Sequence, residues 1–109
     1  MSRCGIPNAG IGARVWLWLA SAMFSTAAQA GDPDRGQQVY ALHCARCHGE
    51  TGRPVWPGTP DFKRTTVLLQ PDARLVAAIR RGRGPMPAYA GVIRDRDMPD
   101  LVAYLRTLH

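Results

Sequence analysis

Several features are missing from this sequence of 109 residues, and each absence narrows what the chain can be. No stretch alternates apolar and polar residues in the manner of a half-buried strand, so no strand is predicted. No internal repeat or low-complexity tract occurs, which leaves a single domain as the simplest organisation. The Cys-x-x-Cys spacing occurs only once, so a zinc site built from two such pairs is excluded.

Long apolar runs are also scarce. The longest uncharged stretch covers residues 15–31 and ends in Ser, Thr, Gln and small residues, which is the short limit for a membrane span. Arg3 and Arg14 precede an apolar segment, Val15–Phe24, and Ala28-Gln29-Ala30 has the small-x-small pattern of a cleavage site. We therefore predict a signal peptide over residues 1–30 and one mature domain over 31–109, with an uncleaved anchor as the alternative. We expect the periplasm of a Gram-negative bacterium, with no membrane span after cleavage.

Acidic residues are fewer than basic residues in this chain. The chain carries 14 Lys and Arg against 8 Asp and Glu, a formal net charge of +6. Removing Arg3 and Arg14 with the signal peptide leaves 12 against 8, or +4. This positive surplus indicates either a docking partner with an acidic surface or a charge that only keeps the protein soluble. The aromatic residues are not interleaved with the basic ones, so no nucleic-acid partner is predicted.

The stretch Cys44-Ala45-Arg46-Cys47-His48 carries the strongest chemical signal in the chain. Two cysteines three residues apart, followed directly by histidine, indicate covalent attachment of a c-type haem. One helical turn would present both thiols to one edge of the porphyrin, and His48 would then supply the proximal iron ligand. We predict one haem c, attached through Cys44 and Cys47.

Three other interpretations of this stretch remain open. A Cys-x-x-Cys pair is also the dithiol of thioredoxin-like proteins, although those place it in a βαβ setting. His43, Cys44, Cys47 and His48 could offer four zinc ligands, but two pairs of sequence neighbours fit one tetrahedron poorly. A plain disulfide would suit an oxidising compartment. The histidine directly after the second cysteine favours haem over these three interpretations.

Local signals predict an all-α domain with three main helices and two loops. A first helix opens at Asp32-Pro33 and runs towards the cysteine motif. Residues 49–60 contain three glycines and three prolines, which predicts a loop. Trp56 and Phe62 are expected to cover the core there, which would be the haem face. A second helix covers residues 71–81, and a second loop follows over 82–92. The last helix covers residues 97–108 and begins late, because Pro99 cannot lie in its interior.

A low-spin electron-transfer haem needs a second axial ligand. His43 directly precedes Cys44 and cannot reach the opposite haem face, and His109 is the chain end, where mobility is usual. Met98 falls in the apolar stripe of the last helix, which is typical of a core residue. Met86 lies in a Gly/Pro-rich loop whose backbone can approach a ligand, although in isolation it is equally a gap-filler. Together with the Cys-x-x-Cys-His motif, Met86 is predicted as the distal ligand, since His/Met ligation is a known arrangement.

The order of these features resembles a single-haem class I cytochrome c. Over residues 31–109 the chain shows that family's first helix, Cys-x-x-Cys-His motif, Ω-type loop, middle helix, methionine loop and last helix. Gly36 and Tyr40 look like the family's glycine and aromatic on the first helix, and Leu101 and Tyr104 look like their partners on the last. The resemblance implies a small all-α, cytochrome c-like domain around one covalent haem, with its terminal helices crossing closely at Gly36.

The resemblance also implies a contact behind the haem histidine. The segment Pro60-Asp61-Phe62 looks like the family's Pro-x-Leu element, with Phe62 in place of leucine. In that element the proline carbonyl accepts a hydrogen bond from the second ring N–H of the histidine, which orients the ring and tunes its donor strength. The carbonyl oxygen of Pro60 is therefore expected to accept a hydrogen bond from the His48 ring. Trp56 and Tyr89 are candidates for a hydrogen bond to a haem propionate.

The implied function is a one-electron carrier rather than an enzyme, with donor and acceptor redox proteins docking transiently at the haem edge. Arg80, Arg81 and Arg83 beside the methionine loop are either a solvated surface or a docking rim. The alternatives are a haem subunit, enzyme or sensor whose sixth ligand is labile, and a thiol-disulfide oxidoreductase that uses Cys44 and Cys47.

Overall fold

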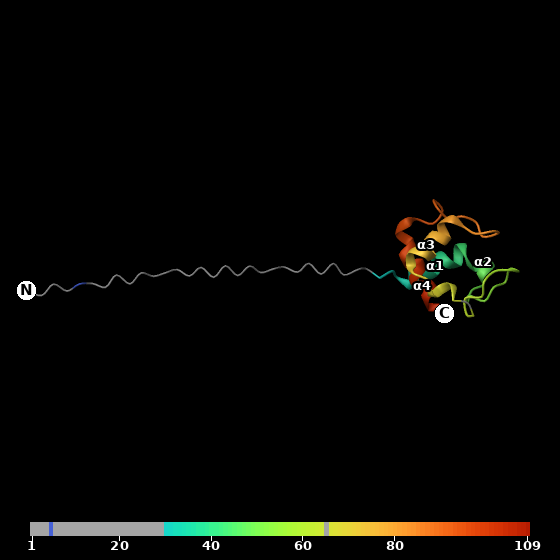
Figure 1. Ribbon diagram of the computed structural model, residues 1–109, viewed down its shortest axis with the longest axis horizontal. Helices are drawn as coiled ribbons and strands as arrows, with labels where there is room; N and C mark the ends of the chain where they lie inside the picture. Colours follow the sequence, from blue (N-terminus) through green and yellow to red (C-terminus); the bar gives the residue numbers. More distant parts are fainter. Residues whose placement is uncertain (1–4, 6–29, 65) are drawn as a thin grey trace, which may run out of the picture.

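Helices and loops make up the part of the chain that the computed structural model describes, namely Gly5, residues 30–64 and residues 66–109, and no strand occurs there. Apart from Gly5 and Ala30, the predicted signal peptide lies outside the described residues. Within these residues, four α-helices and two short 3-10 helices follow one another. They are α1 (Pro33–His43), α2 (Ala45–His48), η1 (Val67–Leu69), α3 (Asp72–Arg81), η2 (Asp95–Asp97) and α4 (Met98–Thr107). Figure 1 shows how the four α-helices are arranged.

The helix ends follow the local signals in the sequence. The Asp32 carboxylate accepts hydrogen bonds from the backbone N–H groups of Asp34 at 2.9 Å and Arg35 at 3.4 Å, which caps α1. Helix α3 ends at Gly82, whose φ of +70° suits a glycine. Pro99 lies in the first turn of α4, where its missing N–H costs no hydrogen bond. The late start of the last helix is therefore confirmed, whereas η1 and η2 were not predicted.

The close crossing of α1 and α4 is the central packing contact of the domain (Figure 1). A Cβ added at Gly36 would collide with the carbonyl oxygen of Asp100 and would lie 2.9 Å from the Cβ of Tyr104. Beside this point, the rings of Tyr40 and Tyr104 pack with centroids 5.2 Å apart. The predicted role of Gly36 is confirmed, since only a residue without a side chain lets the two backbones approach this closely.

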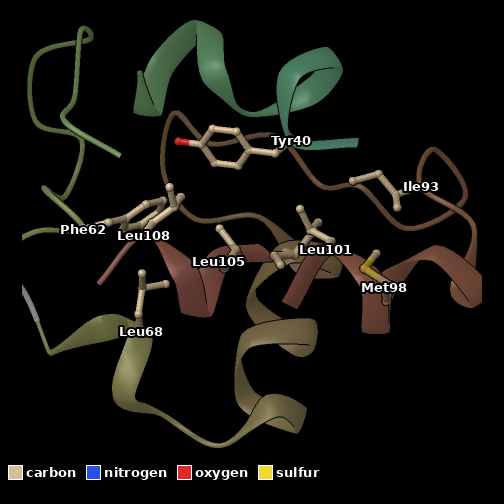
Figure 2. Packing of buried hydrophobic residues seen from close by; sticks show 9 residues of the cluster. Tyr40, Phe62, Leu68, Ile93, Met98, Leu101, Leu105 and Leu108 are labelled. Carbon is tan, nitrogen blue, oxygen red and sulfur yellow. The ribbon is translucent and has the colours of Figure 1, made fainter. Parts of the chain in front are cut away.

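The hydrophobic core extends from this crossing toward the loops. Figure 2 shows Tyr40 of α1 facing the side chains of α4, with Phe62 and Leu68 entering from the first loop and η1. Met98 is buried in the core, as its place in the apolar stripe predicted. Phe62 is buried too, which confirms its predicted place in the core, whereas Trp56 is 56% exposed and its contact with the haem face stays a prediction. The core cluster comprises Tyr40, Phe62, Leu68, Ile79, Ile93, Met98, Leu101, Leu105 and Leu108.

Candidate haem-binding site

The two cysteines of the motif lie on one helical turn. Cys44 is the N-cap of α2 and Cys47 lies within this helix, so the spacing places both thiols on adjacent positions of a single turn. Both are free thiols and half-buried. Gly49 ends the turn with a φ of +76°, and its carbonyl oxygen accepts a buried hydrogen bond of 2.6 Å from the Tyr40 hydroxyl. The α1 core residue Tyr40 therefore fixes where the turn stops.

The environment of the thiols does not favour thiol chemistry. Burial, and to a smaller extent the neighbouring Cys47, raise the pKa of the Cys44 thiol to about 12. A dithiol oxidoreductase needs the opposite, a lowered pKa that supplies a thiolate nucleophile. In the described part of the chain, no three His, Cys, Asp or Glu side chains gather closely enough to hold a metal ion, which also disfavours the zinc interpretation.

His48 follows Cys47 with its imidazole ring partly buried. Burial lowers the pKa of this imidazole, so the ring favours the neutral form that can ligate a metal. The ring stacks on that of Phe62, with centroids 4.6 Å apart and planes inclined by 13°. Its Nδ1 atom is buried and has no hydrogen-bond partner among the described residues.

The hydrogen bond predicted between His48 and Pro60 is not formed in this structure, and for the haem-bound protein it stays a prediction. No carbonyl oxygen of the described residues, that of Pro60 included, accepts a hydrogen bond from this imidazole. Pro60 is exposed, while Phe62, two residues later, turns inward and packs on the ring. The element therefore contacts His48, but through an aromatic side chain rather than through the proline carbonyl.

The Met86 loop is a well-defined turn. Arg83 and Met86 exchange two backbone hydrogen bonds of 3.0 Å, and Gly84 between them has a φ of +53°. A Cβ at Gly82 would lie 2.5 Å from the Met86 carbonyl oxygen and 2.7 Å from the Ala88 nitrogen, so this glycine lets the loop fold back on the end of α3. Met86 itself is half-buried and packs against the core cluster, as Cys44 also does.

Tyr89 ties the Met86 loop to the cysteine turn. Its hydroxyl donates a hydrogen bond of 2.8 Å to the carbonyl oxygen of His43, and the two rings meet edge to face with centroids 5.8 Å apart. Burial raises the pKa of Tyr89, and the nearby Cys44 and Cys47 raise it further. Two segments that are 46 residues apart in sequence are thus neighbours in the fold. Tyr89 is one of two candidates for a hydrogen bond to a haem propionate, and here its O–H donates to the His43 carbonyl oxygen, a contact that no local sequence signal indicates.

These residues fit a covalently bound haem. Two free thiols lie on one turn beside an imidazole whose buried Nδ1 has no partner among the described residues. The Cys44 thiol and the half-buried Met86 thioether pack against the same hydrophobic core. Thiols form the thioether links, and imidazole and thioether are suitable axial ligands of haem iron. The structure therefore brings Cys44, Cys47, His48 and the Met86 loop to one region of the domain. Met98, by contrast, is buried within the hydrophobic core.

The arginines beside this loop differ in their surroundings. Arg80 forms an ion pair of 2.8 Å with Asp95, and Ala90 donates a backbone hydrogen bond to the Arg80 carbonyl oxygen. Arg81 and Arg83 are exposed, and neither forms an ion pair with another described residue. Only two of the three arginines therefore present an uncompensated charge to solvent.

The sequence matches a family model described as "Cytochrome C oxidase, cbb3-type, subunit III" over residues 31–105. The chain belongs to the cytochrome c family. It is 34% identical over 90 residues to the cbb3-type cytochrome c oxidase subunit CcoP of Azospirillum sp. (strain B510), which covers 75% of the chain and 30% of that subunit. It is 31% identical over 91 residues to cytochrome c6 of Picosynechococcus sp. (strain ATCC 27264 / PCC 7002 / PR-6), covering 75% of the chain and 78% of the relative.

A second cytochrome c6, from Synechocystis sp. (strain ATCC 27184 / PCC 6803 / Kazusa), is 32% identical over 85 residues, covering 72% of the chain and 67% of the relative. Both kinds of relative are haem proteins, so the predicted haem c and the all-α class I fold are confirmed. The cytochrome therefore acts in electron transfer through a covalently attached haem. Within the described residues, no helix of the cytochrome is both long and apolar enough to cross a membrane.

Proposed function

We propose that this cytochrome is a periplasmic one-electron carrier whose haem iron is ligated by His48 and Met86. When bound, the haem supplies an iron that alternates between the ferric and ferrous states. The observation that carries the proposal is the hydrogen bond from Tyr89 to His43, because it anchors the loop of the distal methionine beside the cysteine turn. A loop held in this way keeps its ligand in one place, so little needs to rearrange when an electron is transferred.

Each protein group has a defined part in this proposal. Cys44 and Cys47 attach the haem, and the burial that keeps His48 neutral leaves a ring nitrogen available for the proximal bond. The thioether of Met86 is a soft, neutral ligand that favours ferrous iron. If His48 and Met86 both hold the haem iron, they would leave it no open position for a substrate. We therefore infer a carrier rather than an enzyme, sensor or thiol oxidoreductase.

The partners are proposed to be redox proteins that dock transiently near the Met86 loop. Arg81 and Arg83 are exposed there without ion-pair partners among the described residues, so they favour an acidic partner surface. Arg80 contributes less, because Asp95 compensates its charge. The CcoP relative is an oxidase subunit and the other two are cytochromes c6, and the chain spans only 30% of the CcoP sequence.

Paired methionine variants test the ligand assignment. Met86→Ala should lose the methionine-to-ferric charge-transfer band of the visible spectrum, because the thioether is removed from the iron. Met98→Ala is the matched control: it should keep the band while lowering the free energy of unfolding by about 2–5 kcal/mol, since Met98 is a core residue. Loss of the band in Met98→Ala with retention in Met86→Ala would overturn the assignment.

A further inference from the structure

A groove lies on the surface between α1 and the segment that leads into α4. Its volume is about 340 Å³, and it is lined by one face of α1 and by side chains between residues 92 and 100. Leu42 and Val92 line it with 79% and 56% of their surface exposed, although both side chains are apolar. Ile93, which also lines it, is buried in the core cluster (Figure 2). Single exposed apolar residues are ordinary, but two that share one groove with a core residue form an apolar patch.

The arginine and aspartate side chains that line the groove are paired with one another. Arg35 lies 3.6 Å from the Asp100 carboxylate, and Arg94 lies 2.7 Å from that of Asp97. These four side chains therefore compensate each other in charge. An apolar occupant can cover such a groove without leaving an unpaired charge out of contact with water, which would be costly.

The groove adjoins the candidate haem-binding site. Leu42 is two positions before Cys44, and His43, which directly precedes Cys44, also lines the groove. The Tyr89 hydroxyl, which donates to the His43 carbonyl oxygen, joins this end of α1 to the segment that carries Val92. A protein that fills the groove would therefore lie beside the cysteine turn to which the haem is attached.

An uncompensated positive charge lies near the same segment. Ala90 donates a backbone hydrogen bond of 3.2 Å to the Arg80 carbonyl oxygen, so the chain that leads to Val92 runs beside the end of α3. Arg81 is exposed there without an ion-pair partner among the described residues. Two copies of this chain that met face to face at the groove would bring their Arg81 side chains together, and like charges repel. A different protein with carboxylates around an apolar side chain fits both the groove and the arginine.

We propose that the groove is the apolar centre of the docking surface, and that the redox partner fills it with an apolar side chain flanked by carboxylates that face Arg81. This inference deepens the proposed function and rests on it, since it specifies how the partner of that carrier docks. One electron passes between the haem iron and the oxidised or reduced centre of the partner, and no bond forms or breaks. An apolar centre inside a polar rim is the usual composition of a protein interface.

The test compares two one-electron oxidants of the ferrous, haem-loaded protein at high ionic strength. One is ferricyanide, a small hydrophilic anion, and the other is a cupric blue-copper protein that carries an apolar patch bordered by carboxylates. Leu42→Ser and Val92→Ser each remove apolar surface from the groove without changing the net charge. We expect the ratio of the bimolecular rate constant with the copper protein to that with ferricyanide to fall on the order of tenfold in each variant. High salt should not remove this effect, because it does not depend on charge.

Two further variants serve as controls. Leu42→Met keeps an apolar side chain of similar volume and should keep the ratio of the unaltered protein. Leu69→Ser removes a leucine that is 61% exposed on η1, outside the groove, and should also keep it. Because all three positions are exposed, each variant should fold, which circular dichroism checks. An unchanged ratio in both groove serine variants, or an equal fall in Leu69→Ser, would overturn the inference.

Sedimentation velocity tests the other occupant of the groove. We expect the unaltered protein to be a monomer. A dimer that Val92→Ser dissociates would assign the groove to a second copy of the chain and would overturn the inference. A ferrous protein that ferricyanide does not oxidise would instead overturn the proposed function, so the two failures are distinguishable.

Discussion

At the crossing of α1 and α4, backbone packs directly on backbone, whereas the side that carries the cysteine turn and the Met86 loop depends on single side-chain contacts. Gly36 and Asp100 meet without a side chain between them. On the other side, the Tyr40 hydroxyl fixes the end of the turn and the Tyr89 hydroxyl fixes the methionine loop. The comparison shows that the chain builds its scaffold by close packing and places its ligands by a few specific hydrogen bonds.

The largest effect is expected at the crossing itself. Gly36→Ala introduces a Cβ that collides with the Asp100 carbonyl, and neither backbone can yield without separating the helices. We expect the free energy of unfolding to fall by about 3 kcal/mol or more, measured by chemical denaturation of the haem-loaded protein. Gly58→Ala is the control. Its Cβ meets open space, and its φ of +80° alone should cost about 1–2 kcal/mol. Equal losses for both would contradict the close crossing.

The next effect tests the connection between the two sides. Tyr40→Phe removes the hydroxyl that donates to the buried Gly49 carbonyl at 2.6 Å and leaves that oxygen unpaired. We expect a loss of about 1–3 kcal/mol in unfolding free energy. Tyr104→Phe changes the same atom on a neighbouring ring whose hydroxyl has no hydrogen-bond partner in the described chain, so it should cost less than about 0.5 kcal/mol. If Tyr104→Phe proves the more costly change, the proposed role of Tyr40 is wrong.

A third effect is a dependence of stability on pH. The pKa of His48 is lowered in the folded state, so below the ordinary value of about 6.5 the unfolded chain binds a proton that the folded protein does not. Stability should therefore decrease as the pH falls from 7 to 5, with a contribution of up to one proton from His48. A His43→Gln, His109→Gln double variant retains His48 as its one histidine, and its denaturation at both pH values measures the dependence that remains without the other two. A pH-independent stability of that variant would show that His48 is not responsible.

The smallest change concerns charge at the methionine loop. Arg81→Glu and Arg74→Glu alter the net charge equally at opposite ends of α3, which lie about 10 Å apart along the helix axis. With ferricyanide as an anionic one-electron oxidant, Arg81→Glu should slow oxidation of the ferrous protein several-fold at low ionic strength, and high salt should remove the difference. Each variant should change stability by less than about 0.5 kcal/mol. A stronger effect of Arg74→Glu would place the docking side elsewhere.

The scaffold was largely predictable because its signals are local. Asp32 caps α1, Gly82 ends α3 and Pro99 delays α4, and each acts through its own backbone or its immediate neighbours. The role of Gly36 was predicted through the resemblance to a known family, and the structure gives it a physical cause.

The details of the site were less predictable because they depend on contacts between distant segments. Nothing near Tyr89 in the sequence indicates that its hydroxyl reaches the His43 carbonyl. The Pro60 carbonyl is expected behind His48, whereas the contact that this structure shows is the Phe62 ring stacked on the imidazole. Trp56 is large and apolar, but its loop leaves it exposed.

The most direct test of the central claim is the addition of carbon monoxide to the ferrous protein at neutral pH. If His48 and Met86 fill both axial positions, the haem absorption spectrum should remain unchanged. Appearance of the spectrum of a carbon monoxide adduct would show an open or labile sixth position and would contradict the assignment of this cytochrome as a His48/Met86 electron carrier.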